Sequence, residues 1–165
     1  MRGCIGGPSP IRSAFPTPSR AAALAASDEA APLVRGTLND KPVEGLRDAD
    51  DLLAPILEIM VLRDYVWVPW SQIGELTVEA PKHPRDLLWT PASLVLTNGE
   101  ERRGYLPALY PGTHKAADDN LKLGRMTDWI VPEGEGPVRG IGQHLLVGGD
   151  SDFGLLEVRT FTRRE

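Results

Sequence analysis

The stretch from Ser93 to Leu106 reads SLVLTNGEERRGYL and carries the clearest structural signal in the chain. Two strand-like arms flank the dipeptide Asn98-Gly99. This dipeptide favours the positive φ angles of a type I′ turn, which joins two antiparallel strands directly. The stretch therefore predicts a β-hairpin. It lies inside the longer segment Glu79–Trp129, around which the rest of the chain is organised.

Prolines recur beside tryptophan and leucine throughout Glu79–Trp129. Each proline fixes its own φ angle and pushes the preceding residue towards extended backbone, so the aromatic side chains sit on stiff, irregular chain. Pro84 to Trp89 is expected to form a helical turn, because proline is tolerated at the first position of a helix. The segment is suited to holding a shape, and it contains no arrangement that resembles a catalytic centre.

Two further hairpins are predicted before this segment. Residues 33–38 and 42–46 flank the turn residues Asn39-Asp40-Lys41, and the proline that begins the second arm places that arm at a sheet edge. Residues 56–61 and 65–70 are β-branched and aromatic arms around a tight connection. Neither face of the 65–70 arm is clearly polar, so we expect this strand to be covered on both sides.

The end of the chain predicts two closing strands, at residues 140–147 and 155–161, around a Gly- and Asp-rich turn. Asp48 to Asp51 precede residues 52–55 in the pattern of an N-cap followed by a single helical turn. The predicted fold class is therefore α+β. We expect a strand-rich, strongly curved and mainly antiparallel sheet, with short helical turns between its hairpins.

The composition narrows the range of functions. The chain has 165 residues, a formal net charge of -5 and a pI near 5.2. This balance disfavours binding to nucleic acid or to an anionic membrane, because affinity for phosphate comes mainly from clustered Lys and Arg. No apolar run approaches the ~20 residues needed to cross a bilayer. Cys4 is the single cysteine, which excludes an internal disulfide and fits a reducing compartment. The expected partner is another protein.

Residues 1–31 differ in character from the rest of the chain. They hold prolines among Gly, Ser and Ala, and they carry no acidic residue before Asp28. Such a composition buries too little apolar surface to offset ordering entropy, so residues 1 to about 20 are expected to be disordered. A transit peptide is a less favoured interpretation of the same composition. The predicted division is a disordered or residual helical leader at 1–31 and one α+β domain at 32–165.

His114, Asp118 and Asp119 lie within six positions and carry ligand types that bind divalent metals. A small metal-dependent hydrolase that uses this loop is therefore one functional hypothesis. The favoured interpretation is a solvated loop whose Asp residues cap a turn at Leu121, because no further ligand can be identified. Gly140-Ile141-Gly142 lacks the third glycine of a dinucleotide fingerprint, so we expect it to allow close backbone packing instead. No cofactor is expected, and the chain is not expected to be an enzyme.

The chain has four tryptophans, which are Trp67, Trp70, Trp89 and Trp129. Large aromatic side chains favour both protein cores and recognition surfaces. We expect Trp67 to be buried, and Trp89 or Trp129 to lie near a surface depression.

Separated blocks of the sequence resemble the C-terminal part of the ImpE family, also called TagJ. The similarity covers about residues 32–163, and its blocks occur in the order of the family. They are Leu46–Glu58, Tyr65–Trp70, Pro84–Ala92, Leu106–Gly112 and Leu123–Trp129, followed by Gly140–Asp150 and Leu156–Arg159.

This resemblance implies a cytoplasmic, non-catalytic accessory protein of the bacterial type VI secretion system. Members associate with the N-terminal helix of the small sheath subunit, TssB, and are thereby tied to sheath handling with the ATPase ClpV. The family has no catalytic residues to transfer to this chain. The expected physical route is an amphipathic helix laid in an apolar groove, or a strand added to an exposed sheet edge. The expected partner-binding residues are Trp89, Trp129, Arg85 and Tyr110. The sequence indicates no oligomeric state.

One departure from the family concerns the start of the chain. Full members carry a helical, tetratricopeptide-like N-terminal half, and residues 1–31 stand in its place here. The resemblance therefore implies a truncated member, or one whose start lies downstream of the natural start. It also implies weakened partner binding if the missing half contributes to the contact.

Overall fold

The computed structural model describes residues 32–134 and 136–164, so the predicted leader at 1–31 lies outside the described residues. The strands are β1 (Arg35–Leu38), β2 (Lys41–Glu44), β3 (Arg47–Asp48), β4 (Ile56–Val61), β5 (Asp64–Pro69), β6 (Ile73–Val78), β7 (Trp89–Leu96), β8 (Glu101–Pro107), β9 (Thr127–Ile130), β10 (Arg139–Gly142), β11 (Leu145–Gly148), β12 (Ser151–Gly154) and β13 (Thr160–Arg163). The short helices are η1 (Trp70–Gln72), η2 (Pro84–Leu87), η3 (Thr113–Lys115), α2 (Asp119–Lys122) and η4 (Leu155–Glu157).

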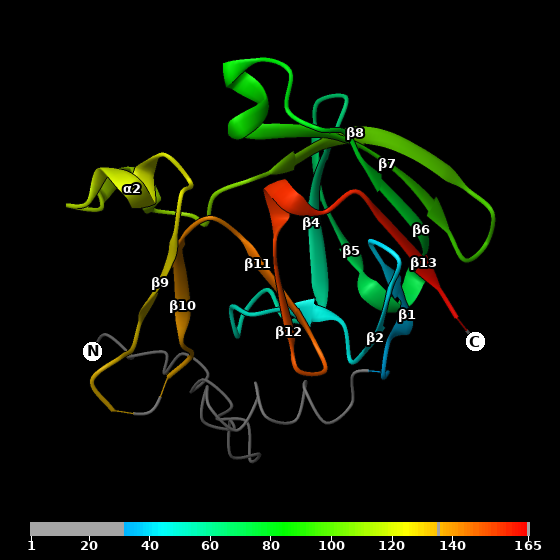
Figure 1. The fold of residues 1–165 in the computed structure, drawn as a ribbon, viewed down its shortest axis with the longest axis horizontal. Coiled ribbons are helices and arrows are strands. Elements are labelled where there is room, and N and C mark those ends of the chain that lie inside the picture. The colour runs from blue at the N-terminus through cyan, green and yellow to red at the C-terminus, as the bar shows by residue number, and fades with distance from the viewer. Residues whose placement is uncertain (1–31, 135, 165) are drawn as a thin grey trace, which may run out of the picture.

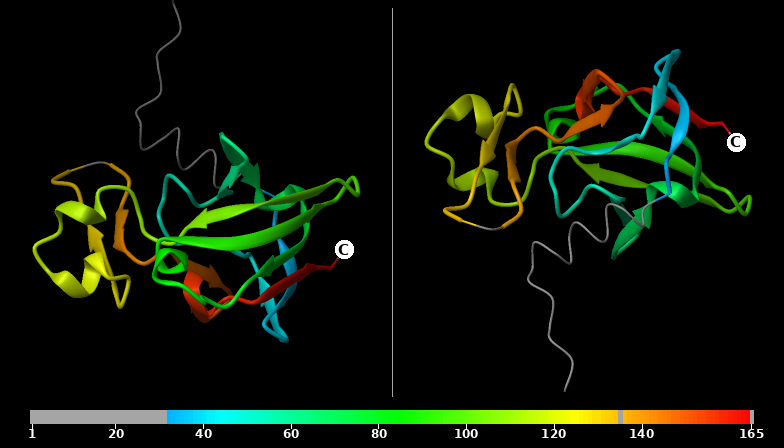
Figure 2. Two further views of the ribbon diagram at one scale, coloured as in Figure 1. Left: turned by 90° about the horizontal axis from the view of Figure 1, so that it is seen from above. Right: turned by 90° about the horizontal axis from the view of Figure 1, so that it is seen from below.

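Within the described residues the strands form three sheets, and every pairing is antiparallel. The largest sheet has eight strands in the order β2-β1-β13-β6-β7-β8-β4-β5. The other two are β12-β11-β3 and the pair β10-β9. The β9–β10 pair and α2 lie together at one end of the molecule, away from most of the eight-stranded sheet (Figures 1 and 2). The strand-rich, mainly antiparallel architecture with short helical turns agrees with the prediction.

The predicted hairpin at 93–106 is confirmed as β7 and β8, but its turn is not type I′. Only Gly99 of the Asn98-Gly99 pair has a positive φ, at 84°. The Leu96 N–H donates to the Glu100 carbonyl at 2.8 Å, which leaves a three-residue connection. The Glu100 N–H turns to the side-chain oxygen of Asn98 at 2.9 Å, so one left-handed glycine is sufficient for the reversal.

The first predicted hairpin is confirmed as β1 and β2, and here both turn residues are left-handed. Asn39 and Asp40 have φ angles of 46° and 64°. The Asn39 side-chain oxygen also accepts from the Arg159 N–H at 2.7 Å, which ties the turn to the segment before β13. Pro42 lies in β2 at the edge of the sheet, as predicted, where its missing N–H breaks no ladder.

The second predicted hairpin is also confirmed, as β4 and β5, but the expected burial of β5 is wrong. This strand is the other edge of the eight-stranded sheet. Val68 faces the core, whereas Tyr65 and Trp67 on the opposite face are 52% and 58% exposed. The expectation that Trp67 is buried is therefore wrong, and Trp70 is the fully buried tryptophan of this stretch. No described segment covers the outer face of β5, and alternation along the strand could not show this.

The predicted closing strands are divided differently in the structure. Residues 140–147 split into β10 and β11, which belong to different sheets, because Gly142 adopts a φ of 96° between them. β11 then pairs with β12 across a tight turn. Residues 155–157 form η4 rather than strand, and only β13 closes the large sheet, between β1 and β6.

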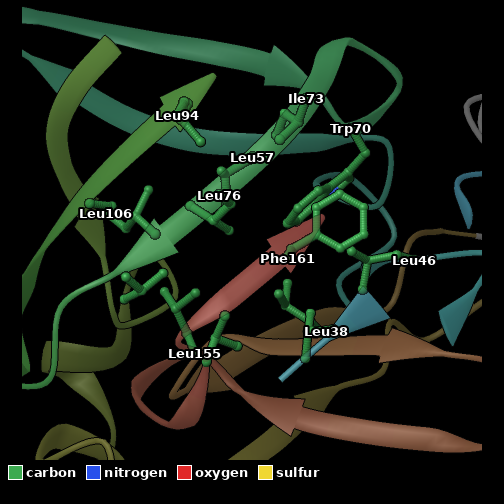
Figure 3. Packing of buried hydrophobic residues seen from close by; sticks show 14 of the residues in the cluster. Leu38, Leu46, Leu57, Trp70, Ile73, Leu76, Leu94, Leu106, Leu155 and Phe161 are labelled. Atoms are coloured by element: carbon green, nitrogen blue, oxygen red, sulfur yellow. The ribbon is translucent and has the colours of Figure 1, made fainter. Parts of the chain in front are cut away.

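One continuous hydrophobic core lies on the inner face of the eight-stranded sheet (Figure 3). Trp70 packs edge-on against Phe161, with ring centroids 6.2 Å apart. Leu155 and Leu46 bring η4 and the segment before β3 into the same cluster. Burial of aliphatic and aromatic surface on this face is the main stabilising contribution to the fold.

The predicted helical turns have mixed outcomes. η2 begins at Pro84 and α2 is capped by the Asp118 side chain, which accepts from the Asn120 N–H, both as predicted. Residues 51–55 form a turn rather than a helix. Asp50 nevertheless acts as the expected cap, because its carboxylate accepts from the Leu52 N–H at 2.9 Å.

Candidate functional site

A cleft of about 440 Å³ opens between the start of β7, the middle of the β4–β5 hairpin and the loop that leads to η3. It is lined mainly by apolar and aromatic side chains. The lining residues are Glu58, Tyr65, Leu88, Trp89, Pro107, Leu109, Tyr110, Pro111, Gly112, Thr113 and His114. Its volume lies in the range of protein sites that hold a small molecule or a few side chains of a partner.

Trp89 is presented to this cleft by η2. The Asp86 carboxylate accepts from the backbone N–H groups of Lys82 and His83, each at 3.0 Å. These bonds hold the pKa of Asp86 below its ordinary value, the Lys82 N–H contributing most. The Thr90 hydroxyl donates to the Asp86 carbonyl at 2.8 Å and fixes the exit from the turn. Trp89 is 45% exposed, so the predicted position beside a surface depression is confirmed for this residue.

Tyr110 forms the base of the cleft and is 1% exposed. Its hydroxyl donates to Asp48 Oδ1 at 2.6 Å. Gly140 lies directly beneath its ring, and a Cβ at that position would overlap the ring atoms. The prediction that Gly140 permits close packing is therefore confirmed. Burial, followed by the effect of the Asp48 carboxylate, raises the pKa of the Tyr110 hydroxyl, which keeps it a hydrogen-bond donor.

The structure brings together only part of the selected set. Trp89 and Tyr110 share the cleft, whereas Trp129 lies on β9 and contacts the Tyr110 ring, with centroids 6.2 Å apart. Trp129 does not line the cleft. Arg85 projects from η2 and lies 3.4 Å from Asp86, and it does not line the cleft either. Tyr110 therefore links the cleft, which it lines together with Trp89, to Trp129 at the β9–β10 end.

A buried polar cluster lies behind the cleft. His144 Nδ1 is 2.8 Å from Asp48 Oδ2, and His144 Nε2 is 3.4 Å from Glu58 Oε2 without forming a hydrogen bond. All three side chains are about 5% exposed. The imidazole ring also packs against the Tyr110 ring at an interplanar angle of 37°, with centroids 4.0 Å apart. Burial raises the pKa of Glu58, and His144 opposes that rise.

β-sheet pairing and a second ion pair hold this cluster in place. Asp48 pairs with Leu146 across the β3–β11 ladder, which places its carboxylate beside His144. The neighbouring Asp50 is fully buried and accepts from Arg139 Nε at 2.7 Å and from the Gly140 N–H at 2.9 Å. Because Gly140 also lies under Tyr110, one glycine joins the ion pair to the base of the cleft.

Sequence reasoning missed the cluster of Asp48, Glu58 and His144. Asp48 was explained as part of a helix-capping run, and neither Glu58 nor His144 belongs to a recognisable catalytic or metal-binding motif. Asp48 and His144 are 96 residues apart, so no spacing rule joins them. The one available signal is an acidic residue inside the apolar strand 56–61, since a carboxylate in such a strand requires a partner.

An exposed aromatic surface continues from the cleft across the sheet. Tyr65 opposes Met60, and Met60 opposes Tyr105, so the three side chains share one face of β5, β4 and β8. Trp67 lies on the same face, because it is two residues from Tyr65 on β5. Trp89 does so too, because it is two residues from Pro91, which opposes Tyr105. We call this surface the aromatic face. Its four aromatic side chains are each between 42% and 58% exposed, and exposed aromatic side chains gathered on one face favour a protein contact.

The metal-loop hypothesis gains no support from the geometry. His114 lines the cleft, but Asp118 caps α2 and Asp119 pairs with Lys122 at 2.9 Å. Within residues 32–134 and 136–164, no group of three or more His, Cys, Asp or Glu side chains is arranged to hold a metal ion. No helix in those ranges is long and apolar enough to span a membrane.

Comparison with known proteins gives concordant results. The family model described as ImpE protein matches residues 40–162. The type VI secretion system accessory component TagJ of Pseudomonas aeruginosa is 41% identical over 134 residues, which cover 79% of this chain and 45% of that protein. The crystal structure of VPA1032 from Vibrio parahaemolyticus has a TM-score of 0.79 at 22% identity, covering 88% of this chain and 54% of that one. The chain thus spans about half the length of the relatives that it matches.

Proposed function

The chain belongs to the ImpE family, and from this membership and the geometry of the cleft we propose that it is a non-catalytic adaptor of the type VI secretion system. In this proposal it binds the N-terminal helix of the small sheath subunit, TssB, in the cytoplasm. Binding there would couple the chain to sheath handling by the ATPase ClpV. The cleft together with the aromatic face is the observation that carries the proposal.

The shape of this surface supports helix binding. An amphipathic helix presents apolar side chains at spacings of three and four residues, and these need a groove with apolar walls. Trp89 and Leu88 provide one wall and Tyr65 another, and all three are about half exposed. Large exposed aromatic side chains beside a depression are the usual anchors of such contacts.

The rigidity of the cleft also supports recognition. The turn that leads to Trp89 is held by the hydrogen bonds of Asp86, and Tyr110 is held by its bond to Asp48. A preformed groove loses little conformational entropy when a partner binds, so more of the contact energy appears as affinity. Trp129 would act indirectly, by packing against Tyr110. Arg85 would contact the polar side of the bound helix beside Trp89.

The test is isothermal titration of the full chain with a synthetic peptide of the cognate sheath subunit's N-terminal helix. We expect saturable binding by the parent chain. Trp89→Ala should weaken it by about 30-fold, the effect of losing a central aromatic anchor. Leu123→Ala is the matched control, because Leu123 is an apolar residue that is 53% exposed and lies outside the cleft. It should bind like the parent.

Two outcomes would contradict the proposal. One is the absence of binding by a folded parent chain. The other is equal affinity for the parent and for a folded Trp89→Ala variant, which would exclude the cleft as the binding site. Circular dichroism of each sample establishes that the variants are folded.

A further inference from the structure

Glu58 is the one acidic residue among the side chains that line the cleft in the described chain. Its carboxylate is about 5% exposed and sits among aromatic walls. Oε1 accepts from the Tyr65 hydroxyl, which itself belongs to the cleft wall. Oε2 has no hydrogen-bond partner among the described residues. Oε2 is itself buried and faces His144 Nε2 at 3.4 Å, so it is Oε1, beside the Tyr65 hydroxyl, that lies on the side of the cleft wall. A buried carboxylate with an unpaired oxygen is costly, so a further donor from the cleft would stabilise Glu58.

The surrounding charges do not cancel. Three buried carboxylates, those of Asp48, Asp50 and Glu58, face two basic side chains. Arg139 pairs with Asp50 at 2.7 Å, and His144 lies between the other two carboxylates. When Glu58 is ionised together with Asp48 and Asp50, three negative charges face at most two positive ones, which leaves at least one negative charge. That excess lies on the side of the cleft, because Glu58 lines it and Asp50 does not.

The aromatic walls favour the same kind of ligand as the carboxylate. The faces of Trp and Tyr rings attract cations, and a guanidinium group stacks on them while its forked N–H donors reach a carboxylate. Tyr65, Trp89 and Tyr110 all line the cleft around Glu58. A purely apolar occupant would exclude water from Glu58 and supply no donor, which would increase the cost of burying it.

We propose that the cleft accepts an arginine side chain of the bound partner, with its stem against Leu88 and Trp89 and its guanidinium on Glu58 and Tyr65. This inference rests on the proposed function, since it names the anchor that the bound helix would carry. It predicts that recognition depends on one positive charge inside an otherwise apolar contact. The cleft therefore selects among amphipathic helices by charge as well as by shape.

A small probe tests this without the sheath subunit. The full chain, labelled with ¹⁵N, is titrated with n-butylguanidinium, and the indole N–H of Trp89 is followed by NMR. The neutral probe n-butylurea has a similar size and shape. We expect a saturable shift with the cation and binding at least about ten-fold weaker with the urea.

Two variants assign the effect to Glu58. Glu58→Gln should weaken binding of the cation by about ten-fold, whereas Glu101→Gln, which removes an exposed carboxylate on β8, should leave it unchanged. Trp89→Leu gives a second test that leaves Glu58 in place. With this variant the NMR shift of the Leu88 backbone N–H is followed, and we expect cation binding to weaken by a similar factor.

Equal binding of the charged and neutral probes, or unchanged cation binding by both a folded Glu58→Gln and a folded Trp89→Leu variant, would overturn the inference. The result is independent of the adaptor proposal, because the probe is not part of the sheath. Helix binding without any preference for the cation would reject the arginine anchor and retain the adaptor function. Cation binding without helix binding would retain the cation site and reject the adaptor function.

Discussion

The Tyr110 hydroxyl donates a 2.6 Å hydrogen bond to Asp48 Oδ1, across 62 residues of sequence. The same hydroxyl accepts from the Leu145 N–H at 3.1 Å. Through these two bonds the base of the cleft, in the segment that follows β8, is attached to β3 and β11 of the three-stranded sheet.

Removal of this hydroxyl should therefore destabilise the whole domain. In Tyr110→Phe, Asp48 and the Leu145 N–H each lose a buried partner, and we expect a decrease of about 1–3 kcal/mol in the free energy of unfolding. Urea denaturation followed by tryptophan fluorescence measures this. Tyr105→Phe is the control, since Tyr105 is 42% exposed. A Tyr110→Phe variant as stable as the control would contradict the assigned role.

Gly140→Ala tests the close packing under Tyr110. The added Cβ would overlap the ring, so we expect a loss of about 1–3 kcal/mol, typical of overpacking. Gly99→Ala is the comparison, because its Cβ would meet nothing within 4 Å and only its positive φ of 84° is strained. That strain should cost about 1 kcal/mol. Thermal melts of both variants should rank Gly140→Ala as the less stable one, and the opposite order would show that the ring can move aside.

Asn39→Ala should be more damaging than a turn substitution usually is. The Asn39 side chain accepts from the Arg159 N–H at 2.7 Å and donates to the Glu157 carbonyl at 2.9 Å, and its backbone φ is 46°. The alanine variant loses both side-chain hydrogen bonds and also the tolerance of asparagine for left-handed backbone. We therefore expect the free energy of unfolding to fall by about 2 kcal/mol. Asp40→Ala is the comparison, because it loses only the tolerance for left-handed backbone. Equal stability of the two variants, measured in urea, would argue against the anchoring role of Asn39.

The raised pKa of Glu58 predicts a specific pH dependence. Burial lifts this pKa above the ordinary value of 4.5, so between the two values the folded state holds a proton that the unfolded state releases. Stability should therefore fall as the pH rises through that window, by about 1.4 kcal/mol for each unit of elevation. Glu58→Gln removes this titration. The stability of the parent relative to the variant, obtained from urea denaturation at several pH values, should decline with rising pH. A flat or rising difference would be inconsistent with a raised pKa.

Local sequence signals predicted the hairpins correctly, but they did not predict which strand faces other segments would cover. Asn39-Asp40 and Asn98-Gly99 marked turns correctly, because turn chemistry depends on neighbouring residues. The exposure of Trp67 was not predicted, because it depends on β5 being an edge strand, which is set by pairing with distant segments. Periodicity shows which side chains share a face, and it does not show whether another segment covers that face.

The candidate site was predictable in part for the same reason. Trp89 follows a proline-initiated turn that the sequence marks, and its place beside a depression was expected. Glu58 and His144 come from segments that meet only in the folded chain, so no local sequence pattern predicts their cluster. The resemblance to the ImpE family supplied the proposed pathway, which residue chemistry alone did not indicate.

The central claim is that the cleft beside Trp89 receives the sheath subunit's N-terminal helix. The most direct measurement is site-specific photo-cross-linking from p-benzoylphenylalanine placed at Leu88, which lines the cleft and is 48% exposed, in the presence of the intact subunit. The same probe at Leu123 is the control. We predict a cross-link from position 88 to the N-terminal helix and none from position 123. A subunit that cross-links from position 123 alone, or that cross-links from position 88 only outside its N-terminal helix, would contradict the account.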